Sequence, residues 1–327
     1  MEINILAVVI VLALICILAL LMGLVFIYIT TNPDPDMRRY DSEKFFIDPN
    51  NPEKKTFPFP SLNSDATVEL SVVVPSYNEE LRLPIMLDEA LEFLSERQKT
   101  DRSFSYEIIV VDDGSKDTTT QVALQYSKKY TTDKVRVLTL AKNRGKGGAV
   151  RLGMLSARGR HLLFADADGA SKFADVSKLE ECLKKMGNRE NMAVVCGSRA
   201  HLEKDSVAQR SYFRTVLMYG FHFVVWSLCV RGIKDTQCGF KIMTREAARR
   251  LFTTLHVNRW AFDVELLYIA QKLKIPIGEV AINWQEIEGS KMVPVFSWIQ
   301  MGKDILLIRL RYILRIWRIP AKSNKQD

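Results

Sequence analysis

The chain has 327 residues, of which 47% are hydrophobic and 26% charged, a composition typical of a globular protein of one large domain with additions. Its five cysteines are scattered and form no C-x-x-C pair, which argues against a disulfide framework or a zinc site. The net charge of +8 points to an acidic partner, such as an anionic membrane surface or a phosphorylated small molecule. Nucleic acid is the least favoured partner, because the sequence contains no zinc-finger, homeodomain or RNA-binding sheet signature.

A membrane anchor is expected over residues 1–31. Residues 5–29 carry no charged side chain, and a helix of about 25 residues extends roughly 37 Å, enough to cross a bilayer. The alternative is a cleaved signal peptide, whose apolar region would span only about 7–15 residues after a basic start. Arg38, Arg39 and Lys44 follow the apolar segment and no basic residue precedes it, so we expect the rest of the chain in the cytosol.

Residues 32–67 are rich in Pro, Asn, Asp and Lys and predict a partly extended stalk that lifts a domain over 68–327 off the membrane. Beyond the stalk, short apolar runs alternate with helical patterns. Strands are expected at 69–75, 107–111, 135–140, 161–165 and 192–196, with helices over 83–98 and from about 117 and 146. The alternation predicts an α/β domain with a mostly parallel sheet, whose ligands bind at the carboxyl ends of the strands.

Polar motifs follow the first two predicted strands. Residues 75–79 read Pro-Ser-Tyr-Asn-Glu, which on its own is compatible with a plain turn. Asp112 and Asp113 end the second strand and could simply cap the next helix, but Ser115 or Asp117 can fill that role. Asp112 and Asp113 would then face the crevice, where a carboxylate accepts hydrogen bonds from a base or a ribose.

A glycine-rich turn over residues 143–148 follows the third strand. It lacks the G-x-x-x-x-G-K-[ST] spacing of a P-loop, which argues against a kinase or an NTPase. Lys146 lies where a helix is expected to begin, and backbone N–H groups at a helix N-terminus favour an anion. The turn therefore suits a phosphate group.

Two carboxylates follow the fourth strand in the motif Asp166-Ala167-Asp168. Carboxylates two residues apart at a strand end can share a divalent metal ion with a diphosphate, since Mg²⁺ and Mn²⁺ take substrate phosphates as further ligands. The alternative is a solvated acidic turn. The other strand-end motifs favour the metal site.

Two segments in the second half suggest contact with a membrane surface. Residues 215–230 are uncharged but too short to span a bilayer, so a helix near 210–231 is either a buried core helix or an interfacial one. A helix near 296–319 would carry Arg311, Arg315 and Arg318 on one face. A basic amphipathic helix of this kind lies on anionic lipid, whereas the alternative is a surface helix packed on the domain.

Taken together, the strand-end motifs resemble the inverting family 2 glycosyltransferases with the GT-A fold. The resemblance continues through residues 197–199, 235–241, 259–263 and 288–291 and covers essentially the whole chain. It points to members that transfer a hexose to a polyprenyl phosphate. It implies UDP-glucose as donor, dolichyl phosphate as acceptor, Mg²⁺ or Mn²⁺ as cofactor and the endoplasmic reticulum membrane as location, and it is compatible with a homo-oligomer.

The resemblance also implies roles for individual residues. Donor nucleotide binding is expected from Pro75, Tyr77, Glu79, Val111, Asp112, Asp113, Lys146, Asp166 and Ala167. Metal binding is expected from Asp166 and Asp168. Catalytic roles are expected for Asp168, Asp263, Arg199 and Lys291, and contacts to the sugar or acceptor for Gln237, Ser290, Arg210 and Arg214. Dolichyl-phosphate mannose synthases carry a glutamine where this chain has Ala170, which reduces the weight of a mannose or GDP-sugar donor.

A phosphate monoester acceptor is largely dianionic at neutral pH, so transfer to it needs no strong general base. The enzyme must instead bring two anions together, and Lys146, Arg199 and Lys291 are expected to offset their repulsion. Asp263 is expected to orient sugar hydroxyls or to stabilise developing positive charge.

Two other classes of protein remain as alternatives. A processive polysaccharide synthase would normally carry Q-x-x-R-W and several membrane spans, but here Arg259-Trp260 follows His256 and Val257. A non-catalytic lipid-binding scaffold would have little reason to combine paired strand-end carboxylates with basic phosphate-binding candidates.

Overall fold

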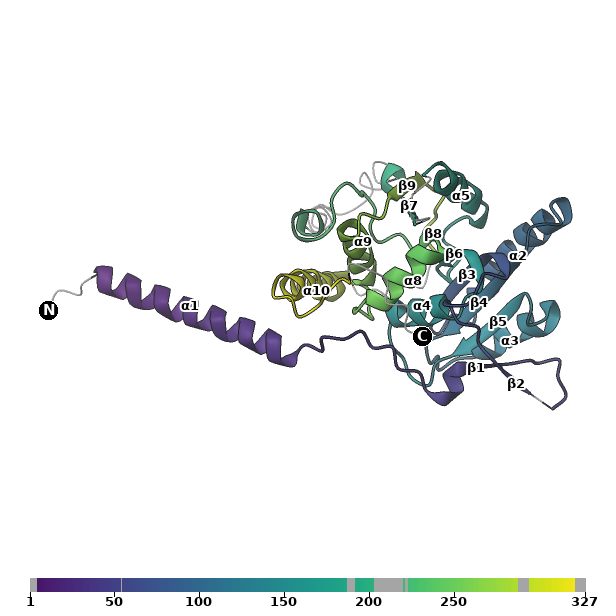
Figure 1. Ribbon diagram of the computed structural model, residues 1–327, viewed down its shortest axis with the longest axis horizontal. Helices are drawn as coiled ribbons and strands as arrows, with labels where there is room; N and C mark the ends of the chain where they lie inside the picture. Colours follow the sequence, from purple (N-terminus) through teal and green to yellow (C-terminus); the bar gives the residue numbers. More distant parts are fainter. Residues whose placement is uncertain are drawn as a thin grey trace.

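The protein is seen here in a computed structural model that describes residues 5–53, 55–186, 192–202, 220, 223–287 and 294–320. Helix α1 (Ile5–Thr30) projects away from the rest of the molecule (Figure 1). Its segment Leu6–Thr30 has a mean hydropathy of 3.4 and none of it is buried. The predicted apolar segment is thus a single helix, long and apolar enough to cross a membrane.

A seven-stranded sheet forms the centre of the domain, in the order β5-β4-β3-β6-β8-β7-β9. The strands are β3 (Val68–Ser76), β4 (Tyr106–Asp112), β5 (Val135–Thr139), β6 (Gly159–Ala165), β7 (Val194–Ser198), β8 (Phe240–Thr244) and β9 (Ile277–Ala281). Strand β8 runs antiparallel to β6 and β7, and the other described pairs of this sheet are parallel. The predicted mostly parallel sheet is confirmed, and β3 to β7 match the predicted strands.

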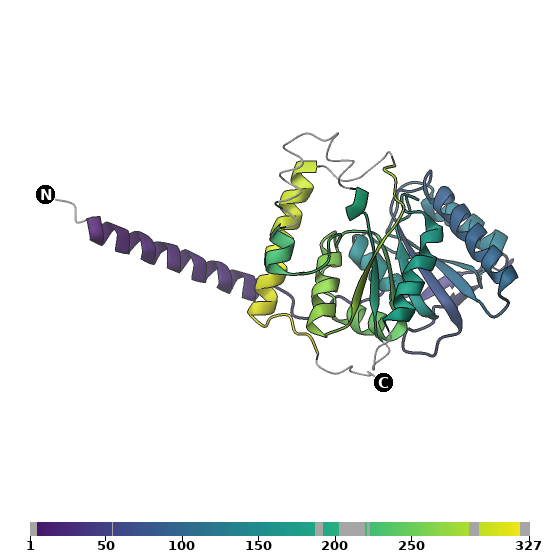
Figure 2. The ribbon, with the colours of Figure 1, turned by 90° about the horizontal axis from the view of Figure 1, so that it is seen from above.

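Helices cover both faces of the sheet (Figure 1, Figure 2). On one face lie α2 (Leu83–Thr100), α3 (Thr119–Tyr130) and α5 (Val176–Lys185), and on the other α4 (Lys146–Leu155), α8 (Arg245–Thr254) and α9 (Phe262–Lys272). Alternate residues of each strand point to opposite faces, so Val73 packs with the second set and Val72 with the first. Burial on both faces explains the continuous apolar runs in the sequence.

The segment over 32–67, expected to be a partly extended stalk, packs along the domain. It contains a short 3₁₀ helix (Asp41–Lys44) and the antiparallel strands β1 (Phe45–Ile47) and β2 (Thr56–Pro58). The carboxylate of Glu43 is buried, lies 2.7 Å from the guanidinium of Arg144 and accepts a hydrogen bond from the backbone N–H of Ala141. The segment is therefore attached through charges that the domain buries.

Helix α10 (Pro294–Ile313) lies on the side of the domain from which α1 leaves (Figure 2). It ends at Ile313, so the prediction that a helix continues to residue 319 is wrong. The chain turns at Arg315, which has a left-handed φ of 57°, and Arg311, Arg315 and Arg318 do not share one helical face. The Nε of Arg311 instead donates a hydrogen bond to the hydroxyl of Thr31, directly after α1.

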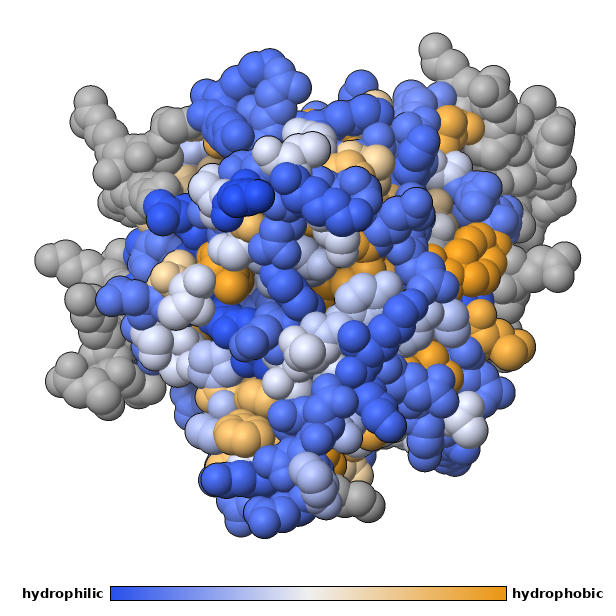
Figure 3. All heavy atoms as spheres, turned by 90° about the vertical axis from the view of Figure 1, so that its right-hand side faces the viewer, coloured by the Kyte–Doolittle hydropathy of each residue, from blue (hydrophilic) through white to orange (hydrophobic). Residues whose placement is uncertain are grey.

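Residues 223–228 are helical, and the thiol of Cys229 contacts the carbonyl of Ile305 in α10 at 3.8 Å. This helix and α10 leave large apolar side chains exposed, namely those of Phe223, Trp226, Leu306 and Ile313. The face that points away from α1 is predominantly hydrophilic by contrast (Figure 3). The predicted helix near 210–231 is described only in part, because residues 203–219 lie outside the described ranges.

We predict that Glu43→Gln lowers the free energy of unfolding by about 3 kcal/mol, because the guanidinium of Arg144 then keeps its burial but loses its charged partner. Denaturant unfolding of the detergent-solubilised protein measures the change. Glu96→Gln is the matched control, since the ion pair of Glu96 with Lys99 is exposed. Equal stability of the two variants would contradict integration of this segment into the domain.

Candidate active site

The motifs after β3 and β4 are joined to each other at the carboxyl edge of the sheet. The backbone N–H of Asp113 donates to the carbonyl of Ser76 at 2.8 Å. The side-chain oxygen of Asn78 accepts the N–H of Lys116 at 2.8 Å, and the N–H of Asn78 donates to the hydroxyl of Ser115 at 2.9 Å. This edge lies beside β6, where the strand order reverses, which is the usual ligand position in such sheets.

Asp112 and Asp113 have different environments. Both carboxylate oxygens of Asp112 accept hydrogen bonds, one from Ser115 and one from the hydroxyl of Thr120, so this side chain holds the turn before α3. The carboxylate of Asp113 accepts the N–H groups of Arg144 and Gly145 at 2.7 and 2.8 Å. Burial raises the pKa of Asp113 to about 6, although these two donors act to lower it. Asp113 therefore ties the end of β4 to the glycine-rich turn.

The remaining donor-binding candidates at the ends of β3 and β4 differ in their exposure and contacts. Pro75 and Tyr77 are half-buried, whereas the side chain of Val111 lies in the core and leaves only its backbone for a ligand. Glu79 forms a bidentate ion pair with Arg82, with both nitrogen–oxygen distances at 2.7 Å. Their roles in nucleotide binding stay predictions.

The glycine-rich turn is packed tightly against the loop before α9. A Cβ at Gly145 would lie 2.7 Å from the carbonyl oxygen of Asn258, and one at Gly147 would lie 2.6 Å from the Cβ of Phe262. The N–H of Gly148 already donates to Asn258. These glycines permit close packing of the turn against the loop before α9.

Asp166 and Lys146 form an ion pair at the edge of the sheet, with 2.6 Å between the Lys146 Nζ and the Asp166 Oδ1. Burial acts to lower the pKa of Lys146, but Asp166 and Asp263 together raise it above its ordinary value. A Cβ at Gly239 would lie 2.0 Å from the Asp166 Oδ2. The Asp166 carboxylate thus occupies the space that a side chain at position 239 would need.

Asp168 lies two residues further and accepts the N–H of Ala170 at 3.0 Å. Burial, and then the negative charge of Asp166, raise the pKa of Asp168 above its ordinary value. A divalent cation would relieve this repulsion. The described residues hold no cluster of three or more His, Cys, Asp or Glu ligands, but two carboxylates suit Mg²⁺ or Mn²⁺, which completes its shell with water and phosphate oxygens.

A second ion pair lies behind the first. The Nζ of Lys241 on β8 is 2.6 Å from the Asp263 Oδ1 in the first turn of α9, and both side chains are inaccessible to water. Lys241 also donates to the carbonyl of Cys238 at 2.7 Å. Burial acts to lower the pKa of Lys241, but the carboxylate of Asp263 raises it above its usual value. Sequence reasoning gave Lys241 no role, although a lysine inside a strand with apolar neighbours was the available signal.

Arg199 and Gln237 lie near the end of β7. The guanidinium of Arg199 forms a bidentate pair with Asp235, at 2.7 and 2.9 Å, and stays about one third exposed, at 32%. The amide nitrogen of Gln237 is buried and has no hydrogen-bond partner among the described residues. The predicted site residues Arg210, Arg214, Ser290 and Lys291 fall outside the described ranges.

Comparison with known proteins identifies the family of the chain. A model of glycosyl transferase family 2 matches residues 71–252. Relatives named dolichyl-phosphate beta-glucosyltransferase are 63% identical in Homo sapiens, covering 89% of this chain and 90% of theirs, and 58% identical in Drosophila melanogaster, covering 90% of each. The Saccharomyces cerevisiae relative of that name is 46% identical and covers 79% of this chain and 80% of its own.

Solved structures show the same fold. Glucosyl-3-phosphoglycerate synthase from Mycobacterium tuberculosis, in complex with phosphoglyceric acid, aligns with a TM-score of 0.53 at 19% identity. The alignment covers 78% of this chain and 81% of that one. A structure of that enzyme with Mn²⁺, UDP-glucose and phosphoglyceric acid aligns with a TM-score of 0.52 at 18% identity, again over 78% and 81%.

The sheet, its carboxylate edge and the matched family model define a glycosyltransferase with the GT-A fold. More particularly, the chain belongs to glycosyltransferase family 2 and to its branch of dolichyl-phosphate beta-glucosyltransferases.

We predict that Gly239→Ala lowers the rate of sugar transfer at least about 100-fold, because the new methyl group must displace the carboxylate of Asp166. Gly302→Ala is the matched control, since a Cβ at position 302 meets no atom within 4 Å. The thermal unfolding temperature of each variant shows whether a lower rate comes from a displaced Asp166 carboxylate in a folded protein or from loss of the fold. A folded Gly239→Ala variant with the wild-type rate would show that the position of Asp166 does not matter.

Proposed function

We propose that the protein transfers glucose from UDP-glucose to dolichyl phosphate, with inversion at the anomeric carbon, and releases UDP and dolichyl β-glucosyl phosphate. The observation that carries this proposal is the 63% identity, over 89% of the chain, to a relative named for that reaction. The paired carboxylates and basic groups at the carboxyl edge of the sheet support it. We further propose that the reaction takes place at the endoplasmic reticulum membrane, with α1 as a single-pass anchor and the catalytic domain in the cytosol.

In the proposed reaction a phosphate oxygen of the acceptor attacks the anomeric carbon as the bond from that carbon to the UDP oxygen breaks. The dianionic acceptor needs no proton removed, so the principal obstacle is repulsion between the two phosphate-bearing substrates. Lys146 is proposed to offset part of this repulsion, since it contacts Asp166, one of the two metal candidates. Arg199 is proposed to meet a second phosphate, and its side chain is about one third exposed. Lys291 is proposed to add to this basic set.

Asp166 and Asp168 are proposed to hold a divalent cation, which when bound would neutralise charge on the departing diphosphate. Lys146 contacts the Oδ1 of Asp166, and it is proposed to meet the phosphates of a donor held by such a cation.

Lys241 is proposed as a positioning residue that acts through Asp263. Its ammonium fixes the carboxylate of Asp263 in a site that water does not reach. Asp263 in turn supports the charged form of Lys146. Asp263 is thereby proposed to support Lys146 in its charged form, in addition to any contact with the glucose.

Gln237 is proposed to contact the sugar or the acceptor, because its buried amide nitrogen has no partner within the described part of the chain. Contacts of Ser290, Arg210 and Arg214 to the sugar or acceptor remain proposed on the strength of the family resemblance. The exposed apolar residues of α10 and of helix 223–228 support a membrane-facing surface through which the acceptor lipid reaches this side.

The proposal is tested with detergent-solubilised full-length protein, dolichyl phosphate, Mn²⁺ or Mg²⁺, and either UDP-glucose or GDP-mannose. We predict a glycolipid from UDP-glucose only, lost on chelation. Asp168→Asn should lower its formation at least about 100-fold, because one of the two charges proposed to hold the cation is removed. Asp65→Asn, at an exposed position, is the matched control.

Electron paramagnetic resonance in the presence of UDP measures the amount of Mn²⁺ bound to the protein and gives a second readout. The bound Mn²⁺ should decrease in Asp168→Asn but not in Asp65→Asn. A product from GDP-mannose alone would overturn the proposed donor while keeping the site. No lipid product from either donor would overturn the proposed reaction.

A further inference from the structure

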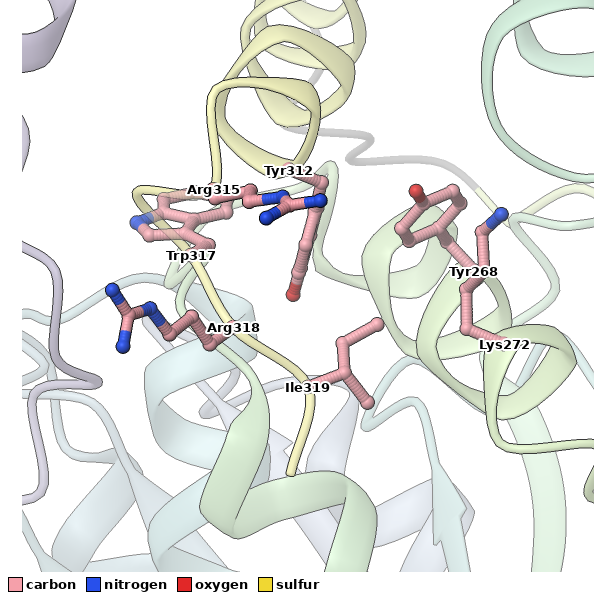
Figure 4. Close-up of a pocket in the computed structure, with 7 residues that line it drawn as sticks. All are labelled: Tyr268, Lys272, Tyr312, Arg315, Trp317, Arg318 and Ile319. Carbon is pink, nitrogen blue, oxygen red and sulfur yellow. The ribbon is translucent and has the colours of Figure 1, made fainter. Parts of the chain in front are cut away.

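An open pocket of about 680 Å³ lies between the end of α9 and the turn that follows α10 (Figure 4). Its lining consists of aromatic, aliphatic and basic side chains, namely Tyr268, Lys272, Tyr312, Arg315, Trp317, Arg318 and Ile319. In Figure 4 the Tyr312 and Tyr268 rings stand on opposite sides above Ile319. Arg315 lies beside Tyr312 on one side of the pocket, Lys272 lies beside Tyr268 on the other, and Arg318 extends outward.

This pocket is separate from the candidate active site. Asp263 lies in the first turn of α9, whereas Lys272 is the last residue of that helix. A helix of 11 residues is about 16 Å long, so the two sites lie at opposite ends of α9. Neither the sugar donor nor the proposed metal ion explains the residues of the pocket.

The pocket carries positive charge that no carboxylate in the described part of the chain neutralises. Among the residues that line it none is acidic, and Lys272, Arg315 and Arg318 form no ion pair with any described carboxylate. Glu265 contacts the lining residue Tyr312, but it is fully buried and its carboxylate is occupied by internal hydrogen bonds. It accepts them from the hydroxyl of Tyr312 and from the backbone N–H groups of His256 and Val257.

The wall of the pocket is attached to the chain where it leaves α1. The indole N–H of Trp317 donates to the carbonyl of Asn32 at 3.0 Å, and the ring stacks on His256 with centroids 4.3 Å apart. The ring of His256 in turn contacts the carbonyl of Pro33. Asn32 lies two residues after the end of α1, a chain distance of at most about 7 Å. With α1 in a bilayer, this wall lies at the depth of the lipid headgroups.

We propose that this pocket binds the phosphate-bearing headgroup of an anionic membrane lipid. Arg315 and Lys272 supply the charge-assisted hydrogen bonds that a phosphate accepts, and Arg318 adds positive charge at the outer edge. The aromatic rings and Ile319 supply an apolar surface for the glycerol and the first acyl carbons, which a free phosphate ion would not use. Tyrosine and tryptophan side chains are favoured at this depth of a membrane.

Binding of a headgroup would fix the orientation of the domain on the membrane. The pocket joins α9 to the residues that follow α1, and α9 carries Asp263 at its other end. A lipid held there would set the height and rotation of the carboxylate edge relative to the bilayer, where the proposed acceptor lies.

Native mass spectrometry of the detergent-solubilised full-length protein counts retained lipids and tests the proposal without an activity measurement. The probes are phosphatidylserine, phosphatidylcholine and dolichyl phosphate, each added alone. We expect preferential retention of phosphatidylserine over phosphatidylcholine, weakened at least tenfold in the double variant Lys272→Gln/Arg315→Gln. The matched control is Lys128→Gln/Lys129→Gln, which removes the same charge from exposed positions on α3, on the side away from α1.

Equal retention of phosphatidylserine by the wild type and by Lys272→Gln/Arg315→Gln would overturn the proposal, and so would an equal loss in both double variants. Competition by millimolar inorganic phosphate that removes the lipid completely would show an ion site in place of a headgroup site. Retention of dolichyl phosphate alone, lost in the pocket variant, would assign the pocket to the acceptor and overturn the anionic phospholipid as its occupant. A wild-type protein that retains phosphatidylserine but transfers no sugar would count against the proposed function and would not affect the proposal for the pocket.

Discussion

Lys241 and Asp263 lie inside the protein as an ion pair, 2.6 Å apart and both removed from water. Burial of two charges is costly unless each keeps its partner, so the strand and the helix that carry them must meet at one place. Strand β8 brings Lys241 between β6 and β7, and the first turn of α9 brings Asp263 to the same point. The position of Asp166, Lys146 and the glycine-rich turn follows from this meeting.

Four charges of alternating sign are arranged from the core toward the crevice. The described contacts join Lys241 to Asp263 and Lys146 to Asp166, and the charge of Asp263 acts on Lys146 as well. Such an array favours the charged form of Lys146 although this side chain is largely buried. It leaves the carboxylate of Asp166 at the edge where phosphate-bearing ligands are proposed to bind. Replacing any one member shifts the electrostatic balance of the others.

Helix α9 connects this array to the membrane side. Asp263 and Glu265 lie on the same helix but serve different partners, since Glu265 binds the loop at residues 256–257 and the hydroxyl of Tyr312 in α10. That loop continues to Asn258, which accepts the N–H of Gly148 in the glycine-rich turn. The anchor side and the catalytic side of the domain are therefore linked through a single short helix.

Much of the fold could be predicted from the sequence, because strands buried on both faces are continuous apolar runs and the strand-end motifs follow them directly. Strands β8 and β9 were not predicted. Strand β8 is short, runs antiparallel and contains Lys241, which interrupts its apolar run. The stalk prediction rested on proline content, whereas the packing of that segment depends on Glu43 meeting Arg144 far along the chain. The end of α10 at Ile313 was missed for a similar reason, because the spacing of arginines continues past the turn at Arg315.

Some site residues could be found from sequence motifs, whereas others depend on contacts between distant parts of the chain. Sequence motifs brought Asp166, Asp168 and Lys146 to attention, because each follows a strand or begins a helix. The pairing of Arg199 with Asp235 and the burial of Lys241 against Asp263 are tertiary, and no local pattern encodes them.

A double-mutant cycle on the buried pair tests the central claim most directly, with Lys241→Met, Asp263→Leu and the combination compared by unfolding and by sugar transfer. Each single variant should lose about 3–5 kcal/mol of stability, because it leaves one charge buried without a partner. The double variant should be more stable than either single variant and still lack sugar transfer. Additive losses of stability, or a double variant that transfers sugar at the wild-type rate, would contradict the account.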